Sequence, residues 1–216
     1  LLIAGSKEKP GAALISAKAC MRSGAGMLTV HSVSSVLEAL IIRTPEAMCE
    51  TDPSADHISE LEKPERFDAI GIGPGIGTHQ ESQQVVKKLI HYYQGNLVMD
   101  ADALNILSEN KTWLSFIPAN SILTPHPKEF ERIAGKFSND VEKLQALKKF
   151  AVQHQCIIIL KGAYAAIAMP DGHIHFNSSG NAGLAKAGSG DGLTGIILGL
   201  LARGYNSPQA GKHSHQ

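Results

Sequence analysis

Short apolar runs alternate with longer amphipathic segments along most of this chain of 216 residues. The apolar runs predict strands at residues 1–4, 27–30, 69–73, 97–100, 122–124 and 156–161. Apolar residues at helical spacing predict helices at residues 12–23, 34–42, 80–93, 141–154 and 190–203. Strands that alternate with helices indicate a mostly parallel central sheet with helices on both faces, which is a three-layer α/β fold.

The remaining segments predict a hairpin at one edge of the sheet and a single domain. Residues 165–169 and 173–176 flank Pro170-Asp171-Gly172 and predict an antiparallel hairpin at the edge of the sheet. Residues 46–64 are polar and acidic and predict a surface excursion without a function. No repeat or linker interrupts the chain, so we expect one domain over residues 1–216. The start inside an apolar run, without an initiator Met, suggests truncation.

The end of the chain carries two histidines. We expect the tail after Tyr205 to lack a final helix, so that the domain is truncated at both ends. His213 and His215 then belong to a disordered end rather than to a metal site.

Composition narrows the classes of function. Lys and Arg number 20 and Asp and Glu number 20, which gives no electrostatic footprint for nucleic acid or for an anionic membrane. No apolar run approaches the roughly 20 residues that span a bilayer, and no basic stretch precedes the apolar start, so we expect no signal peptide. We therefore expect a cytoplasmic protein. Cys20, Cys49 and Cys156 are far apart and predict reduced thiols.

A glycine-rich turn, Gly188-Ser189-Gly190-Asp191, lies at the head of the last predicted helix. Glycines let a backbone approach a ligand closely, and the N–H groups of a helix N-terminus attract anions. The turn therefore fits a phosphate site with Asp191 beside it. It fits an ordinary helix cap equally well, because Asp is favoured in a first helical turn. Gly192, Gly195 and Gly199 follow and predict close packing against another element.

Two further turns follow predicted strands. Gly71-Ile72-Gly73-Pro74-Gly75-Ile76-Gly77 departs from the dinucleotide-binding pattern, so it is either a tight strand-to-helix turn or a loop that faces a ligand. Asp100-Ala101-Asp102 places two carboxylates in three residues, which suits a Mg²⁺ ion held through its water shell. Asp102 also fits the cap of a following helix.

The last two turns carry a histidine and a lysine. In Thr124-Pro125-His126-Pro127-Lys128-Glu129 two prolines restrict the backbone around His126, so its ring is aimed and suits a substrate contact. Glu129 is either a first-turn acid or an indirect metal ligand. In Leu160-Lys161-Gly162 the lysine ends the most apolar strand, where its charge needs a partner such as phosphate. A plain bend into the hairpin is the alternative.

All five turns lie at the ends of predicted strands. In open α/β sheets, ligands bind at the carboxyl ends of the strands. Their joint occurrence at this edge indicates a binding site more strongly than any single turn does.

Taken together, these turns resemble one known family. The motifs, in their order and spacing, are similar to those of the NAD(P)H-hydrate dehydratases from the first residue to about Tyr205: Ala4-Gly5-Ser6, Pro10-Gly11-Ala12-Ala13, Gly73-Pro74-Gly75-Ile76-Gly77, Asp100-Ala101-Asp102-Ala103-Leu104-Asn105, Thr124-Pro125-His126-Pro127-Lys128-Glu129, Leu160-Lys161-Gly162, and Gly180-Asn181-Ala182-Gly183 through Gly190-Asp191. The resemblance implies a ribokinase-like fold, similar to the carboxy-terminal half of the bifunctional repair enzyme that also carries an epimerase domain.

The resemblance also implies an activity. The expected enzyme is a hydro-lyase that repairs the 6S hydrate of NADH or NADPH at the expense of ADP or ATP. The hydrate hydroxyl is phosphorylated and phosphate is then eliminated, with Mg²⁺ bridging phosphate oxygens. The implied partners are the hydrate and ADP or ATP, with room for a homo-oligomer and for a fused or separate epimerase domain.

Site residues carry over by position. The resemblance implies that Asp191 is the catalytic residue, at the hydroxyl of the hydrate. It implies a hydrate site at Ala12, Gly77, His126 and Asp191, a nucleotide site at Lys161, Gly162, Ala163, Tyr164, Ala165, Asn181, Gly188, Ser189 and Gly190, and water-mediated metal contacts from Glu129 and Asp100.

The chain departs from the family at two positions. Ala165 stands where the nucleotide strand usually has Thr, and Gly192 stands where a larger aliphatic residue usually follows the catalytic Asp. Two other functions therefore stay open. A small-molecule kinase of the same fold would accumulate a phosphorylated alcohol, and a non-catalytic nucleotide sensor would bind ADP without turnover. The His126 turn and the Asp100 stretch argue against the kinase, whereas Ala165 supports the sensor.

Overall fold

The computed structural model describes residues 1–177 and 186–214. Within these ranges nine strands form one sheet in the order β3-β2-β1-β4-β5-β6-β7-β8-β9. The strands are β1 (Leu2–Ile3), β2 (Thr29–Ser32), β3 (Met48–Thr51), β4 (Ala69–Ile72), β5 (Asn96–Met99), β6 (Ile122–Leu123), β7 (Ile157–Leu160), β8 (Ala166–Ala168) and β9 (Ile174–Phe176).

Strands β1 to β7 are parallel, whereas β8 and β9 are antiparallel to their neighbours. The mixed α/β architecture and the edge hairpin are therefore confirmed. Strand β1 lies between β2 and β4, with Leu2 paired to Val30 on one side and to Gly71 on the other. The chain thus adds β2 and β3 on one side of β1 and then crosses back to add β4 to β9 on the other side. Such a reversal point is where open α/β sheets bind ligands.

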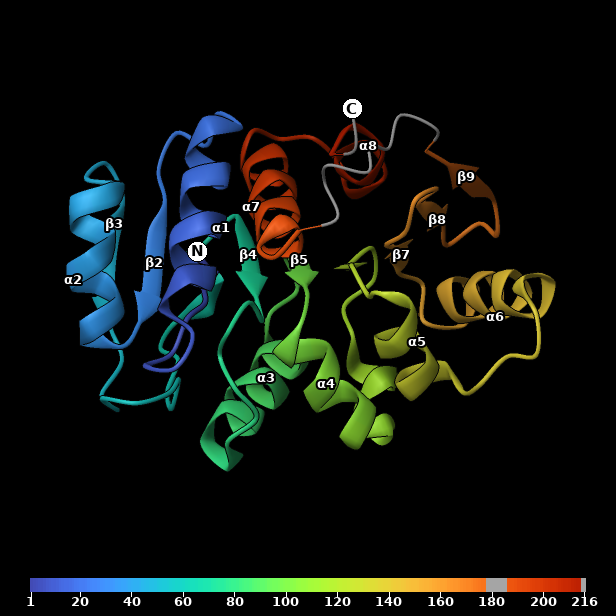
Figure 1. Ribbon diagram of the computed structural model, residues 1–216, viewed down its shortest axis with the longest axis horizontal. Helices are drawn as coiled ribbons and strands as arrows, with labels where there is room; N and C mark the ends of the chain where they lie inside the picture. Colours follow the sequence, from blue (N-terminus) through green and yellow to red (C-terminus); the bar gives the residue numbers. More distant parts are fainter. Residues whose placement is uncertain (178–185, 215–216) are drawn as a thin grey trace.

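Helices cover both faces of the sheet, as the alternation of apolar runs predicted. One face carries α1 (Pro10–Arg22), α2 (Ser34–Arg43), α7 (Ser189–Ala202) and α8 (Ser207–His213), and the other carries α3 (Gln80–Tyr92), α4 (Asp102–Glu109), α5 (Pro127–Ala134) and α6 (Asp140–Gln153) (Figure 1). Short 3₁₀ turns span Pro64–Arg66 and Lys111–Phe116. Each face has its own apolar core, because the central strands bury side chains on both sides.

Helices α1 and α7 lie side by side above the sheet (Figure 1). A Cβ atom added at Gly195 would collide with the carbonyl oxygen of Ser16, and one at Gly199 would lie 2.7 Å from that of Cys20. These two glycines therefore allow the backbones of the helices to touch, as their spacing predicted. Gly192 is different, since a Cβ there would meet only the Ile15 side chain, at 3.9 Å.

Two predictions about irregular segments are wrong. Residues 46–64 include the edge strand β3, which pairs with β2 in parallel. Its polar composition concealed it, because most of its side chains are exposed at the edge of the sheet. The tail beyond Tyr205 forms α8, capped by Asn206 and anchored by the buried side chain of Ala210.

Helix α8 also places one of the terminal histidines. The His213 ring lies 5.8 Å from the Tyr205 ring, so this residue is not part of a disordered end. His215 lies outside the described residues. In the part of the chain that the structure describes, no helix is long and apolar enough to cross a membrane.

Candidate functional site

The five turns predicted from sequence meet at the carboxyl edge of the parallel strands. Gly77, Asp100, His126 and Lys161 follow β4, β5, β6 and β7 in turn, and Ala12 lies in the first turn of α1, after β1. Helix α7 brings Asp191 to the same edge from above the sheet, where its neighbour α1 carries Ala12. The Ser16 hydroxyl donates to the Asp191 carbonyl (2.9 Å) and fixes this helix end against α1.

The turn before α7 has the backbone that a close ligand requires. Gly188 is the N-cap residue with φ of 86°, a conformation that favours glycine, and a Cβ there would lie 2.6 Å from the Ile15 side chain. Among the described residues, no group donates a hydrogen bond to the Asp191 carboxylate. Within the described residues, the Asp191 side chain therefore does not cap the helix.

The electrostatic surroundings of Asp191 favour a base. Burial raises the pKa of this carboxyl above its ordinary value, and the negative charge of Asp100 raises it further. Lys161 and, more weakly, Lys9 oppose the shift. A carboxylate with a raised pKa accepts a proton more readily than an ordinary one.

Asp100 joins the end of β5 to two other elements. Its carboxylate is almost completely buried, with 1% of the residue exposed. One oxygen accepts a hydrogen bond from the Lys161 ammonium (2.7 Å), and the other accepts one from the Thr194 hydroxyl on α7 (2.9 Å). The lysine charge that needed a partner has therefore found one in Asp100, directly below the glycine-rich turn.

Asp102 makes a similar junction on the other side. Its Oδ2 atom accepts hydrogen bonds from the Gly77 backbone N–H and from the Lys9 ammonium, each at 2.9 Å. Its Oδ1 atom accepts one from the Asn105 side chain (3.3 Å). Asp102 is the first residue of α4, but its carboxylate ties together the loops after β1 and β4 rather than capping its own helix.

His126 is held in place by more than its two prolines. It is the N-cap residue of α5, and its Nδ1 atom accepts the backbone N–H groups of Lys128 and Glu129. The Glu129 carboxylate accepts the His126 backbone N–H (2.9 Å), which completes a capping box. In the neutral ring the proton therefore resides on Nε2, which lies 3.5 Å from the Oε1 atom of Glu129.

The two carboxylates predicted to contact a metal through water do not form a direct metal site. Both Asp100 oxygens are engaged by Lys161 and Thr194, and one Glu129 oxygen is engaged by the His126 backbone. In the ranges that the structure describes, no three His, Cys, Asp or Glu side chains gather to hold an ion. Direct coordination of Mg²⁺ by these residues does not fit the structure, and a water-mediated contact stays a prediction.

The predicted nucleotide segment after β7 is open to solvent. Gly162, Ala163 and Tyr164 are exposed, with Tyr164 at 73%, whereas Ala165 is buried just before β8. The Lys161 backbone N–H donates to the Pro125 carbonyl (2.9 Å), which links this segment to the His126 turn. Asn181 lies outside the described residues.

Sequence reasoning missed several residues that build this site. Lys9 and Ser16 carry no motif of their own, and their roles depend on contacts with Asp102 and Asp191, which are distant in sequence. Thr194 reads as an ordinary helix residue. A hydroxyl three residues after Asp191, one helical turn further on, was the available signal, because such residues share a helix face.

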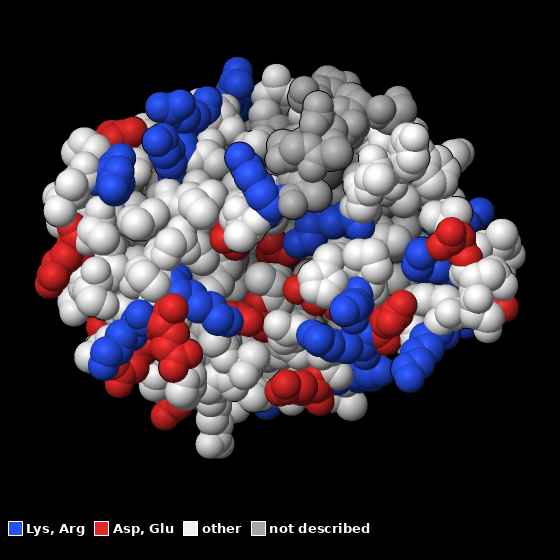
Figure 2. Space-filling model, viewed as in Figure 1, with Lys and Arg blue, Asp and Glu red and all other residues white. Residues whose placement is uncertain are grey.

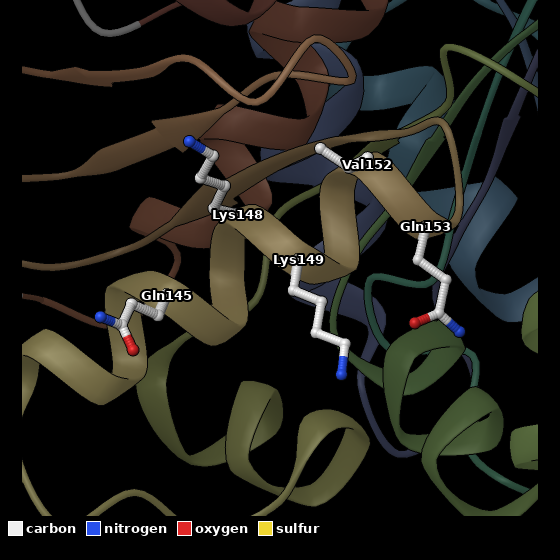
Figure 3. Close-up of a pocket in the computed structure, with 5 residues that line it drawn as sticks. All are labelled: Gln145, Lys148, Lys149, Val152 and Gln153. Carbon is white, nitrogen blue, oxygen red and sulfur yellow. The ribbon is translucent and has the colours of Figure 1, made fainter.

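A second region of the described surface has different chemistry. A hollow of about 410 Å³ lies along α6, lined by Gln145, Lys148, Lys149, Val152 and Gln153. All of these come from one helix, and Figure 3 shows Lys148 and Lys149 pointing in opposite directions. Figure 2 shows basic and acidic side chains interspersed over the viewed face, without a continuous field of one sign.

Known proteins are similar to this chain in sequence. The chain is 40% identical over 206 residues to the ADP-dependent (S)-NAD(P)H-hydrate dehydratase of Bacillus subtilis, a match that covers 93% of this chain and 71% of the relative. It is 36% identical over 214 residues to the bifunctional NAD(P)H-hydrate repair enzyme of Moorella thermoacetica, covering 94% of this chain and 40% of the relative. The chain therefore spans less than half of the bifunctional relative.

Solved structures agree on the fold. The Bacillus subtilis ADP/ATP-dependent NAD(P)H-hydrate dehydratase, co-crystallized with ATP/Mg²⁺, superposes with a TM-score of 0.82 at 34% identity, over 99% of this chain and 75% of that chain. The ribokinase-like fold predicted from the motifs is confirmed by such neighbours. The model of the NAD(P)H-hydrate dehydratase family matches residues 1–214, and the chain belongs to this family.

Proposed function

We propose that this protein dehydrates the hydrate of NADH or NADPH back to the reduced cofactor, with ADP or ATP as phosphate donor. The observation that carries the proposal is the position of Asp191, whose carboxylate has a raised pKa and lies at the start of α7 near two lysine–carboxylate pairs. The membership of this chain in the NAD(P)H-hydrate dehydratase family supports the same activity.

The chemistry that this arrangement favours is phosphoryl transfer followed by elimination. A hydroxyl is a poor leaving group, and phosphorylation makes it a good one. Asp191 takes the proton of the hydrate hydroxyl while that oxygen attacks the terminal phosphorus of the nucleotide, and the nucleotide leaves one phosphate shorter. Phosphate then departs from the ring carbon, a proton leaves the neighbouring carbon, and the ring double bond is restored.

The nucleotide side is assigned to the β7 end and the turn before α7. Lys161, close to the position of Gly190, supplies a positive charge for the phosphates, and the exposed segment that ends at Tyr164 offers a surface for the base. The backbone N–H groups at the start of a helix suit the transferring phosphoryl group. The Bacillus subtilis relative is named ADP-dependent, which supports ADP as the donor.

The hydrate side is assigned to Ala12, Gly77 and His126. Gly75 packs against Ala12 so closely that an added Cβ would lie 2.9 Å from the Ala12 Cβ, which holds the two loops together. The His126 ring has 44% of its side chain exposed, and its Nε2–H, which lies 3.5 Å from Glu129 Oε1, is assigned to an oxygen of the substrate. Mg²⁺ would arrive with the nucleotide phosphates and neutralise part of their charge.

The proposal is tested by recovery of absorbance near 340 nm from hydrated NADH, with ADP and ATP assayed separately. We expect turnover with at least one nucleotide and release of inorganic phosphate. Accumulation of a stable phosphorylated product would indicate a small-molecule kinase instead. ADP binding by calorimetry without any recovery of NADH would indicate a nucleotide sensor and would contradict the proposal.

A further inference from the structure

We propose that Asp100 and Asp102 are positioning residues that divide the site, with Asp100 ordering the nucleotide side and Asp102 ordering the hydrate side. The inference rests on the proposed function, which assigns Lys161 and Gly190 to the nucleotide and Gly77 to the hydrate. It goes beyond that function because it gives separate tasks to two carboxylates only two positions apart.

The contacts of Asp100 all lead toward the nucleotide side. Its two oxygens accept from Lys161, at the end of β7, and from Thr194, on α7. A Cβ added at Gly190 would lie 3.2 Å from the Lys161 ammonium and 3.6 Å from the Asp100 carboxylate. The Asp100 carboxylate therefore fixes the lysine directly beneath the glycine turn, where phosphate is expected.

The contacts of Asp102 lead toward the hydrate side. One oxygen holds both the Gly77 N–H and the Lys9 ammonium. Lys9 is the N-cap residue of α1, the helix that carries Ala12 in its first turn. Asp102 therefore sets the spacing between the two segments that are expected to enclose the hydrate. Among the described residues, Asp100 and Asp102 share no hydrogen-bond partner.

The residue between them explains how neighbours can serve opposite sides. Residues two apart in an extended strand point to the same face. Ala101 has φ of 47° and ψ of −117°, a conformation that a residue with a Cβ rarely adopts. This turn of the backbone breaks the strand pattern and lets the two carboxylates reach different partners. Unusual backbone of this kind concentrates at functional sites.

The test separates the two sides kinetically. In Asp100→Asn we expect the KM for ADP to rise about tenfold, because a charge-assisted hydrogen bond is lost, with the KM for hydrated NADH within about twofold of the wild type. In Asp102→Asn we expect the reverse. Calorimetric titration with ADP should show weakened binding in the first variant only.

Two milder variants keep the test decisive if a buried substitution impairs folding. Thr194→Val removes one Asp100 contact and should raise only the KM for ADP. Lys9→Met removes the charged partner of Asp102 and should raise only the KM for the hydrate, with recovery in Lys9→Arg, which keeps a positive charge.

The result that overturns the proposal is also clear. If each variant raises both KM values together, in step with a lower melting temperature, the two carboxylates support the fold and do not divide the site. Failure of the wild type to restore NADH would instead remove the proposed function. The ADP titrations of the Asp100 and Asp102 variants would then still decide the nucleotide half of the inference.

Discussion

Two carboxylates in this protein, the buried Asp52 and the partly buried Asp191, have opposite surroundings. Asp52 follows the edge strand β3 and accepts hydrogen bonds from the His31 ring, from the backbone N–H groups of Ser54, Ser59 and Glu60, and from the Ser59 hydroxyl. The Asp191 carboxylate accepts none from the described residues.

The pKa values of the two groups follow this difference. Burial alone would raise the pKa of Asp52, but the hydrogen bonds from His31 and Ser59 outweigh it and hold the pKa well below its usual range. Burial raises the pKa of Asp191, and Asp100 adds to the effect. A carboxylate whose oxygens accept several hydrogen bonds holds a loop together, whereas one that accepts none can still take up a proton. The opposite pKa shifts therefore follow the hydrogen-bond donors that surround Asp52 and are missing around Asp191 among the described residues.

The sharpest test of this contrast is Asp191→Asn. We expect turnover of hydrated NADH to fall by about a thousandfold, because the base is lost. The affinity for ADP and the melting temperature should stay close to those of the wild type. The assay is NADH recovery, with calorimetry for ADP. A variant that retains full activity would remove Asp191 from the mechanism.

The matching change at the other carboxylate is Asp52→Ala. It leaves the buried His31 ring and several backbone N–H groups without their acceptor, so we expect the free energy of unfolding to fall by about 2–4 kcal/mol. The kcat should change little, because Asp52 belongs to the edge of the sheet. Chemical denaturation measures the first quantity and the NADH assay measures the second.

A nearby control sharpens that result. Asp56 pairs with Lys7 at the surface, and both side chains are largely exposed. Asp56→Ala should therefore leave the unfolding transition where it is. If Asp52→Ala and Asp56→Ala are equally mild, the hydrogen bonds around Asp52 do not stabilise the fold.

The two carboxylates should also respond differently to pH. The pKa of Asp52 is lower in the folded protein than the ordinary value of 3.8, so its stabilisation is present above that pH and is lost as the pH falls through the folded pKa. The pKa of Asp191 is raised, so kcat/KM should already decline at a pH above 3.8. Chemical denaturation of Asp52→Asn at several pH values tests the prediction for Asp52. A pH–rate profile of the wild type tests the prediction for Asp191.

The smallest expected effect concerns the backbone between the two aspartates of the divided site. Ala101→Gly removes the steric cost of its positive φ, so we expect a gain in stability of about 1 kcal/mol. Ala103→Gly, within α4, should instead lower stability by about 1 kcal/mol. Equal losses in the two variants would mean that the conformation of Ala101 carries no strain.

The fold was largely accessible from the sequence because buried parallel strands are continuous apolar runs that end in polar turns. Strand β7 and the turn at Lys161 illustrate this rule. Strand β3 was not accessible, since an exposed edge strand has no apolar pattern. Helix α8 was missed because it is short and draws its stability from its cap and from packing against the sheet.

The site was accessible in part. The glycines, His126 and Lys161 could be predicted because each lies in a local turn motif that follows an apolar run or begins a helix. Contacts between distant segments could not be found, since no local pattern predicts that Lys9 meets Asp102 or that Thr194 meets Asp100. The assigned roles in binding and catalysis stay predictions that the variants above will test.

The contact of α1 with α7 has a consequence for how this site can change. A side chain at Gly195 would strike the Ser16 carbonyl, so any larger residue there would push the two helices apart. This close contact therefore ties the position of Asp191 on α7 to that of Ala12 on α1. A change of acceptor molecule, in evolution or by design, would therefore have to come from the loops around Gly77 and His126. The distance between α1 and α7 is set by their backbone contact.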